Sequence, residues 1–283
     1  MKSTLTAPDS SKPSFPISFV LAAFGFTWTF WLIAWLFGRS VGQGPLQLTL
    51  LVIGGFGPTL MACVFVAQRE GWRNAAVFLG RGFNPRFPLP MLAFVVLIPL
   101  VVNGAAYFTT GGRRIETNLV HLVGTYVLWF FFGGPFNEDY GWRGYVLPRL
   151  LAKWNPVIAS LLLGFLWSAW HWPLFYLTGT TQSQTPLWVF FLSTTAQAIV
   201  YTWIWNQAGK KLLPVMLYHS FSNISVVVFP QPHIVGGIDR STYVEALLAL
   251  SLALTLVLFY GKRLGIKEVP DHTTDSLTPE PGF

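Results

Sequence analysis

The chain has 283 residues, of which 53% are hydrophobic and only 10% are Asp, Glu, Lys or Arg. Soluble domains carry about 25% charged residues, so this chain has too little charge to cover a soluble surface. The composition also excludes a disordered chain, a collagen, a coiled coil and a small disulfide scaffold. A single cysteine, Cys63, cannot form an internal disulfide. The class that remains is a polytopic membrane protein.

Apolar runs of about 20 residues, the length that crosses a bilayer as a helix, recur along the chain. We therefore predict an all-α membrane bundle of about eight transmembrane helices. The expected spans are 15–37, 46–67, 89–108, 119–137, 156–177, 187–206, 212–229 and 243–260. Pro58 is expected to kink the second span. The runs lack the alternation typical of a membrane β-barrel.

One membrane-embedded domain is predicted over residues 15–264, with a polar tail at each end. The tail at 1–14 contains two prolines and is expected to be mobile. The tail at 265–283 contains four acidic residues and three prolines, a composition typical of disorder. The chain is long enough for a self-contained bundle, so a monomer is expected.

The net charge of +7 follows the predicted topology. With both termini inside, 13 of the 18 Lys and Arg residues fall on the cytoplasmic side and four fall outside. Basic residues concentrate on the cytoplasmic side of membrane proteins, so this asymmetry favours an even number of spans with N-in and C-in orientation. A nucleic-acid partner is not needed to explain the charge. A nucleotide is not expected either, because the sequence lacks a glycine-rich phosphate loop.

The first polar cluster inside the predicted spans is Glu138-Asp139-Tyr140-Gly141-Trp142-Arg143. Asp139 and Arg143 are four residues apart, so on a helix they share a face and form an ion pair in the favourable order. Glu138 points about 100° away from Asp139 at 3.6 residues per turn. Its carboxylate is thereby left for general acid–base chemistry. A structural ion-pair network at a helix end explains this cluster equally well.

Two later spans carry further polar groups, His171 four residues after Trp167, and His219 with Asn223. Taken alone, each histidine is better explained as hydrogen-bonded between helices. Together with Glu138 they suit hydrolysis. A carboxylate and an imidazole can hold and deprotonate a water, while a second imidazole and an amide can stabilise an oxyanion.

The same groups leave the choice of cofactor open. Glu138, His171 and His219 could bind zinc, which accepts imidazole nitrogen and carboxylate oxygen. They could equally activate water without a metal. Two other ionisable residues are assigned structural roles: His121, and Glu245, which is expected to pair with Arg240 or to lie near the lipid headgroups.

The three clusters resemble the motifs of the CPBP family of intramembrane proteases, the CAAX-processing and bacteriocin-processing enzymes that include the Ras-converting CAAX endopeptidase. The family's first motif is Glu-Glu-x-x-x-Arg, and Glu138 to Arg143 stand in its place. The second motif is an aromatic residue, three further residues and a histidine, and it is matched by Trp167 to His171. The third motif, His-x-x-x-Asn, is matched by His219 to Asn223. The motif core covers about 130–225, and the segments 141–145 and 170–175 look like the bacterial branch.

The sequence departs from the family pattern at two positions. Asp139 replaces the second glutamate of the first motif, which shortens the side chain and keeps its charge. Trp167 replaces the usual phenylalanine of the second motif. Neither residue is assigned to the chemistry, so the resemblance implies that both support the site.

The resemblance implies an endopeptidase that cuts a membrane-associated or lipidated protein or peptide. Glu138 would activate the water, and His171 would help to hold it. His219 and Asn223 would form the oxyanion site, and Arg143 would organise the first motif. Family members are called metalloproteases, yet a glutamate-dependent mechanism without metal is also argued for them. Zinc and no cofactor therefore both remain open.

The resemblance of the segments 141–145 and 170–175 to the bacterial branch implies a location in the bacterial inner membrane, with the active-site cavity towards the cytoplasm. The predicted spans place the motifs at unequal depths. Counted at 1.5 Å per residue, His171 lies roughly 22 Å along the fifth span, whereas Glu138 lies at the end of the fourth. The depths agree only if the fifth helix begins in the cytosol or the fourth runs differently.

Two functions from other classes compete with proteolysis. A proton-coupled transporter would use the carboxylate and the histidines as a relay, although the chain lacks the repeated halves common in transporters. A non-catalytic scaffold or immunity-type protein would bind a membrane partner without cutting it. Replacing Glu138 by glutamine separates the three: it should abolish hydrolysis, leave a scaffold's binding unchanged and alter the pH dependence of transport.

Overall fold

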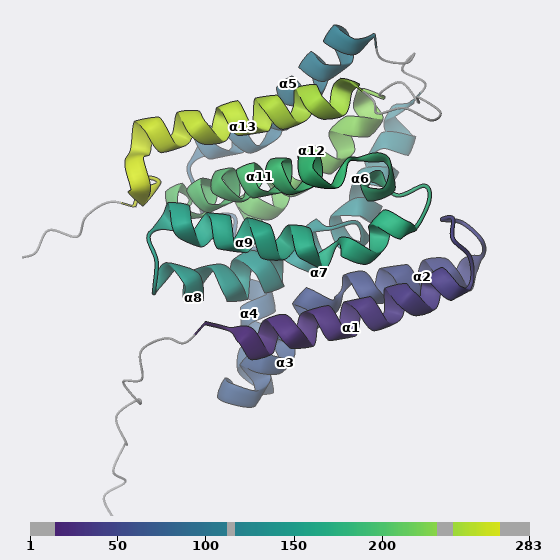
Figure 1. Cartoon of the computed structure of the whole chain (residues 1–283). Helices are drawn as coiled ribbons and strands as arrows, with labels where there is room; N and C mark the ends of the chain where they lie inside the picture. Colours follow the sequence, from purple (N-terminus) through teal and green to yellow (C-terminus); the bar gives the residue numbers. More distant parts are fainter. Residues whose placement is uncertain (1–14, 112–116, 231–239, 267–283) are drawn as a thin grey trace, which may run out of the picture.

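The computed structural model describes residues 15–111, 117–230 and 240–266 (Figure 1). These residues form helices and loops, together with one isolated β-bridge between Ser40 and Thr178. The predicted all-α membrane bundle is thus confirmed. The expected tail at 1–14 lies outside the described residues, as does 267–283 of the C-terminal tail.

Sixteen helical elements follow one another along the described residues. They are α1 (Ile17–Leu36), α2 (Pro45–Gly55), α3 (Gly57–Glu70), α4 (Trp72–Arg81), α5 (Leu89–Thr110), α6 (Leu119–Phe132), α7 (Pro135–Asp139), η1 (Tyr140–Val146), α8 (Leu147–Leu151), α9 (Pro156–Trp170), η2 (Trp172–Tyr176), α10 (Thr181–Gln184), α11 (Leu187–Gln207), α12 (Leu213–Val228), α13 (Arg240–Tyr260) and η3 (Gly261–Arg263).

Six helical segments of the described chain are long and apolar enough to cross a membrane. A seventh is the α2–α3 pair, which bends by 45° where Pro58 opens α3. The expected kink at Pro58 is therefore present. The remaining predicted span, 212–229, corresponds to α12, a shorter apolar helix. Eight crossings and the orientation remain predictions.

Local sequence signals explain where several helices begin. Pro45, Pro58 and Pro156 lie in the first turns of α2, α3 and α9, where the missing N–H has no helical partner to lose. Asn155 also caps α9, because its side-chain oxygen accepts a hydrogen bond from the Ile158 N–H at 3.1 Å. These signals fix the start of the helix that ends at the second motif.

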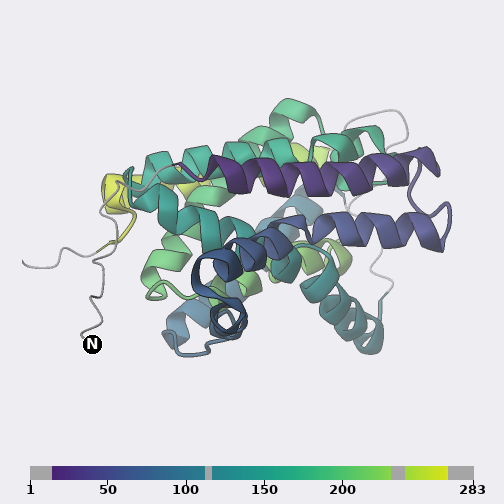
Figure 2. The ribbon, with the colours of Figure 1, turned by 90° about the horizontal axis from the view of Figure 1, so that it is seen from below.

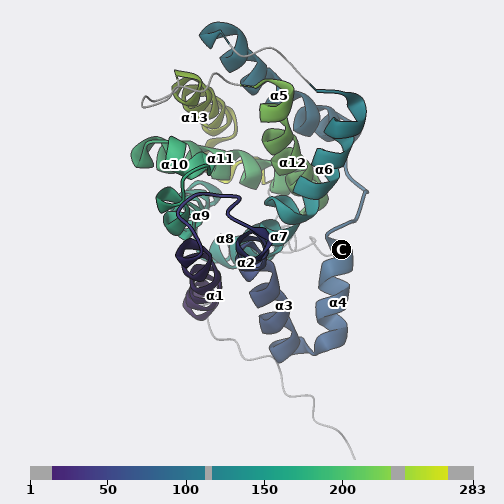
Figure 3. The same cartoon turned by 90° about the vertical axis from the view of Figure 1, so that its right-hand side faces the viewer.

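Helix α11 lies inside the bundle, packed against α9 on one side and α13 on the other (Figure 1). α5 and α12 pack together, and α12 also contacts α6. α1 runs alongside α2 (Figure 2). α3 and α4 form a neighbouring pair that extends away from α11 and α13 (Figure 3).

The fourth predicted span was too short. The helical segment continues from Leu119 to Leu151, over 33 residues, so Glu138 lies inside it. The segment breaks at Gly133–Gly134, then passes through α7, the π-helix η1 and α8. The expected end at 137 rests on the cost of charge in a membrane. Here the charges are buried by protein, and Glu138 and His171 line the same cavity despite the unequal depths expected from the spans.

The centre of the bundle is built around the first motif. The largest fully buried side chains include Tyr140, Trp142, Arg143 and Tyr145 of η1, together with Trp170 of α9. A π-helical turn is rare and occurs frequently at functional sites. The outer surfaces of the helices carry exposed Leu, Val and Phe side chains, as expected for surfaces that face lipid.

Candidate active site

Glu138 lies in α7 and is 7% exposed. Its Oε2 atom accepts a hydrogen bond of 2.6 Å from the indole N–H of Trp167 on α9. The predicted ion pair between Asp139 and Arg143 is present. The hydrogen bond from Trp167 was not predicted. It fixes one oxygen of the carboxylate, so the orientation of Glu138 is set by the second motif.

Asp139 joins the first motif to the third. Its Oδ1 atom accepts a hydrogen bond from Nη1 of Arg143 at 2.8 Å, which is the predicted ion pair. Its Oδ2 atom lies 3.1 Å from Nδ1 of His219 on α12. A carboxylate accepts hydrogen bonds, so Nδ1 carries the proton and Nε2 is the nitrogen left for other partners. Asp139 therefore orients the imidazole of His219.

Arg143 is completely buried between two aromatic rings. Its guanidinium carbon lies 3.9 Å from the centre of the Trp167 ring and 4.2 Å from that of Tyr201 on α11. Cation–π contacts of this kind are strongest where the cation is withdrawn from water. Arg143 thus links three elements, η1, α9 and α11, as well as neutralising Asp139.

His171 ends α9 at the edge of the site. Its Nδ1 lies 2.8 Å from the backbone oxygen of Trp167. A carbonyl can only accept, so Nδ1 is the donor, and in the neutral ring Nε2 carries the lone pair. The helix stops here because Pro173 follows, and the chain continues as the 3-10 turn η2. Trp167 thus contacts both residues: its indole N–H donates to Glu138, and its backbone oxygen accepts from His171.

His219 and Asn223 converge on Gly134, at the break between α6 and α7. A Cβ atom placed on Gly134 would lie 2.8 Å from Nε2 of His219 and 3.2 Å from Nδ2 of Asn223. Asn223 Nδ2 also donates to the backbone oxygen of Gly133 at 2.8 Å. Gly134 has φ +131°, a conformation that other residues rarely adopt. The position therefore requires glycine, both for its backbone and for the space between the two donors.

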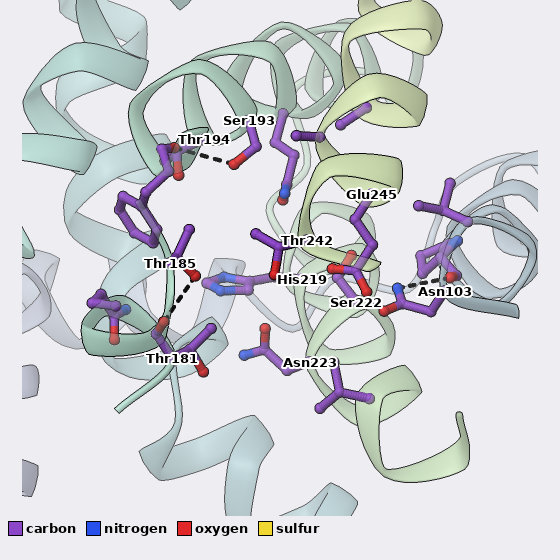
Figure 4. Close-up of a pocket in the computed structure, with 18 of the residues that line it drawn as sticks. Asn103, Thr181, Thr185, Ser193, Thr194, His219, Ser222, Asn223, Thr242 and Glu245 are labelled. Carbon is purple, nitrogen blue, oxygen red and sulfur yellow. Dashed lines mark hydrogen bonds between the residues drawn. The ribbon is translucent and has the colours of Figure 1, made fainter. Parts of the chain in front are cut away.

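One cavity of about 430 Å³ is lined by Glu138, His171, His219 and Asn223 together. It extends between α5, α11, α12 and α13, and Figure 4 shows the part around His219, Asn223 and Glu245. A second cavity of about 250 Å³ shares Glu138 and His171 and is otherwise mostly apolar. The carboxylate and the imidazole thus lie where two cavities meet.

Some residues of this site were missed or assigned another role. Tyr201 had no motif to mark it, and a tyrosine inside an apolar span was the only signal. Gly134 could have been found from the Gly133-Gly134-Pro135 break directly before the first motif. Glu245, expected to pair with Arg240 or to lie near headgroups, lines the larger cavity.

The donor arrangement does not fit a bound metal. Across 15–111, 117–230 and 240–266, the His, Cys, Asp and Glu side chains form no group of three or more that could hold a metal ion. Glu138, His171 and His219, the residues that the sequence left open for zinc, therefore do not form a ligand set in this geometry.

Comparison with known proteins agrees with the motifs. Residues 120–225 match the family described as "Type II CAAX prenyl endopeptidase Rce1-like". The chain is also 22% identical to "CAAX prenyl protease 2" of Methanococcus maripaludis, in an alignment that covers 88% of this chain and 95% of that protein. Both findings confirm the resemblance to the CAAX-processing proteases, and they support an intramembrane endopeptidase. The matches and the apolar helices together indicate an integral membrane protein.

Replacing Trp167 by phenylalanine should lower kcat about 10-fold to 100-fold and change KM little. The phenyl ring can still face Arg143, but Glu138 loses its N–H donor, and hydrogen bonds to charged groups contribute about 1.5–3 kcal/mol. Steady-state hydrolysis rates would measure the effect. Trp203→Phe is the matched control, because the buried Trp203 indole N–H has no hydrogen-bond partner among the described residues. Equal losses in the two variants would contradict a positioning role for Trp167.

Proposed function

We propose that this protein hydrolyses a peptide bond of a membrane-associated protein or peptide, with Glu138 as the general base. One observation carries the proposal: a single cavity brings together the Glu138 carboxylate, the His171 imidazole, and the His219 and Asn223 groups from α12. This combination supplies both a group that activates water and donors for an oxyanion.

In the first step, a water lies between Glu138 and His171. One hydrogen of the water bonds to the carboxylate of Glu138, and the other bonds to Nε2 of His171. Glu138 removes a proton as the water oxygen attacks the carbonyl carbon of the substrate. The proton then passes from Glu138 to the leaving nitrogen, and the C–N bond breaks to give a carboxylic acid and an amine. Each reaction cycle therefore consumes one water and breaks one peptide bond.

In the same step, negative charge develops on the carbonyl oxygen of the substrate. His219 Nε2 and Asn223 Nδ2 both lie around the space at Gly134, so both can donate to this oxygen. Donation from Nε2 requires the doubly protonated ring, whose Nδ1–H is already held by the Asp139 carboxylate. Donors that are fixed before the reaction stabilise the transition state without reorganisation.

The name of the matched relative, "CAAX prenyl protease 2", points to a lipidated protein as its substrate. We infer that a lipidated or membrane-embedded peptide is the substrate class, which fits active-site groups buried within membrane-spanning helices. The bacterial inner membrane and a cavity open to the cytoplasm belong to the same proposal. The bias of basic residues towards one side supports the N-in and C-in orientation of the helices.

The test is hydrolysis of quenched fluorescent peptides with apolar or acylated ends by the purified protein in lipid nanodiscs. Mass spectrometry in ¹⁸O-labelled water should find one ¹⁸O atom in the new carboxylate, because water is the nucleophile. Activity should persist after dialysis against a metal chelator. Loss of activity with the chelator and its recovery with zinc would contradict the metal-free steps. Binding of the peptides without any cleavage would contradict the function.

A further inference from the structure

The larger cavity carries a second carboxylate that the proposed steps do not use. Glu245 reaches into the cavity from the second turn of α13 (Figure 4). Of the described residues that line the cavity, only Glu138 and Glu245 are acidic, and none is lysine or arginine. The described lining thus holds two carboxylates and two imidazoles, those of His171 and His219, and no lysine or arginine.

The wall near Glu245 is unusually polar for the interior of a membrane bundle. Asn103 of α5, Ser222 of α12 and Thr242 of α13 line it together with Glu245 (Figure 4). Ionisable groups inside membrane proteins are costly and generally mark the path or site of a polar ligand. A hydrocarbon chain would gain nothing from these groups, whereas a peptide would find hydrogen-bonding partners for its backbone and side chains.

The two cavities at Glu138 and His171 differ in this respect. Apart from Asn137, His171 and Gln182, the smaller one is lined by apolar residues and glycines, and Glu138 is the acidic residue among the described ones lining it. The larger one contains Glu245 as well. A substrate whose scissile bond lies at Glu138 can therefore extend into either cavity, and the larger one offers the additional carboxylate of Glu245.

We propose that Glu245 forms a subsite that binds a basic side chain, lysine or arginine, of the substrate peptide. This inference rests on the proposed function, because it places the subsite in the same cavity as Glu138. A charge-assisted hydrogen bond to a carboxylate is about twice as strong as a neutral one. Two carboxylates in a cavity whose described lining holds no lysine or arginine also disfavour an acidic side chain near Glu245.

The experiment separates binding from cleavage. The Glu138→Gln protein in lipid nanodiscs lacks the general base, so it should bind the peptides without cutting them. It also lacks the Glu138 carboxylate in the cavity, so a preference for a positively charged peptide reports on Glu245. Labelled acylated peptides that carry lysine, norleucine or glutamate at successive positions are the probes, and fluorescence anisotropy gives the Kd. At one position, lysine should bind about 10-fold tighter than norleucine, which corresponds to about 1.4 kcal/mol.

The double variant Glu138→Gln/Glu245→Gln should lose this preference, whereas Glu138→Gln/Glu70→Gln should keep it, because Glu70 lies exposed at the end of α3. Equal binding of the lysine and norleucine peptides at every position would overturn the subsite. So would a preference that survives Glu245→Gln, or no binding of any lysine peptide. A Glu245-dependent preference without cleavage by the wild-type protein would uphold the subsite and refute the proposed hydrolysis.

Discussion

Replacing Glu138 by glutamine should lower kcat for peptide hydrolysis by about 100-fold to 10,000-fold, the range that general base catalysis contributes. Glutamine has nearly the same shape, and its amide oxygen can still accept the hydrogen bond that Trp167 donates to Oε2. The variant loses only the ability to take a proton from water. Substrate binding and the unfolding temperature should therefore stay close to those of the wild type.

The expected loss is measured as single-turnover hydrolysis of a quenched peptide in nanodiscs. Glu70→Gln is the control, because it makes the same chemical change at an exposed position of α3. Full activity of Glu138→Gln would refute Glu138 as the base. A variant that still binds the peptide but cannot cut it would agree with the proposed steps and would argue against a scaffold, whose function requires binding alone.

Replacing Arg143 by methionine should destabilise the protein by about 3–5 kcal/mol, the cost of removing one partner of a buried ion pair. Arg143 and Asp139 are both fully buried, and their side chains meet at 2.8 Å. The change leaves the Asp139 carboxylate with His219 as its remaining partner among the described contacts. It also removes the cation held between Trp167 and Tyr201.

Thermal unfolding in detergent would measure this loss, with Arg73→Met on the exposed surface of α4 as the control. The double variant Asp139→Asn/Arg143→Met should recover part of the stability, because no uncompensated charge is then buried. It should remain inactive, since His219 has lost the carboxylate that orients it. An Arg143→Met protein as stable as the wild type would contradict the structural role of the pair.

The sequence predicted the helical class and the ion pair of the first motif, but it ended the fourth span too early. Apolar runs mark membrane helices because the bilayer imposes one length and one polarity on them. The motif spacing identified the pairing of Asp139 with Arg143, since both lie within one turn of a helix. It could not predict that the fourth span continues beyond Glu138, because hydropathy does not reveal charges that the protein itself buries.

Contacts between distant segments required the tertiary structure. The hydrogen bond from Trp167 to Glu138 joins residues 29 apart, and that from His219 to Asp139 joins residues 80 apart. Spacing within one helix gives no information on which helices are neighbours. The same holds for Glu245: its place at the start of a span does not reveal that it lines the cavity with Glu138.

By itself, then, the sequence determined that the chain is a membrane helix bundle and which groups are available for chemistry, because composition and helical period are local properties. Only the tertiary structure decided how those groups are oriented. The break at Gly134, the burial of Arg143 and the polar wall around Glu245 arise where helices meet, and their energies depend on partners far away in the chain.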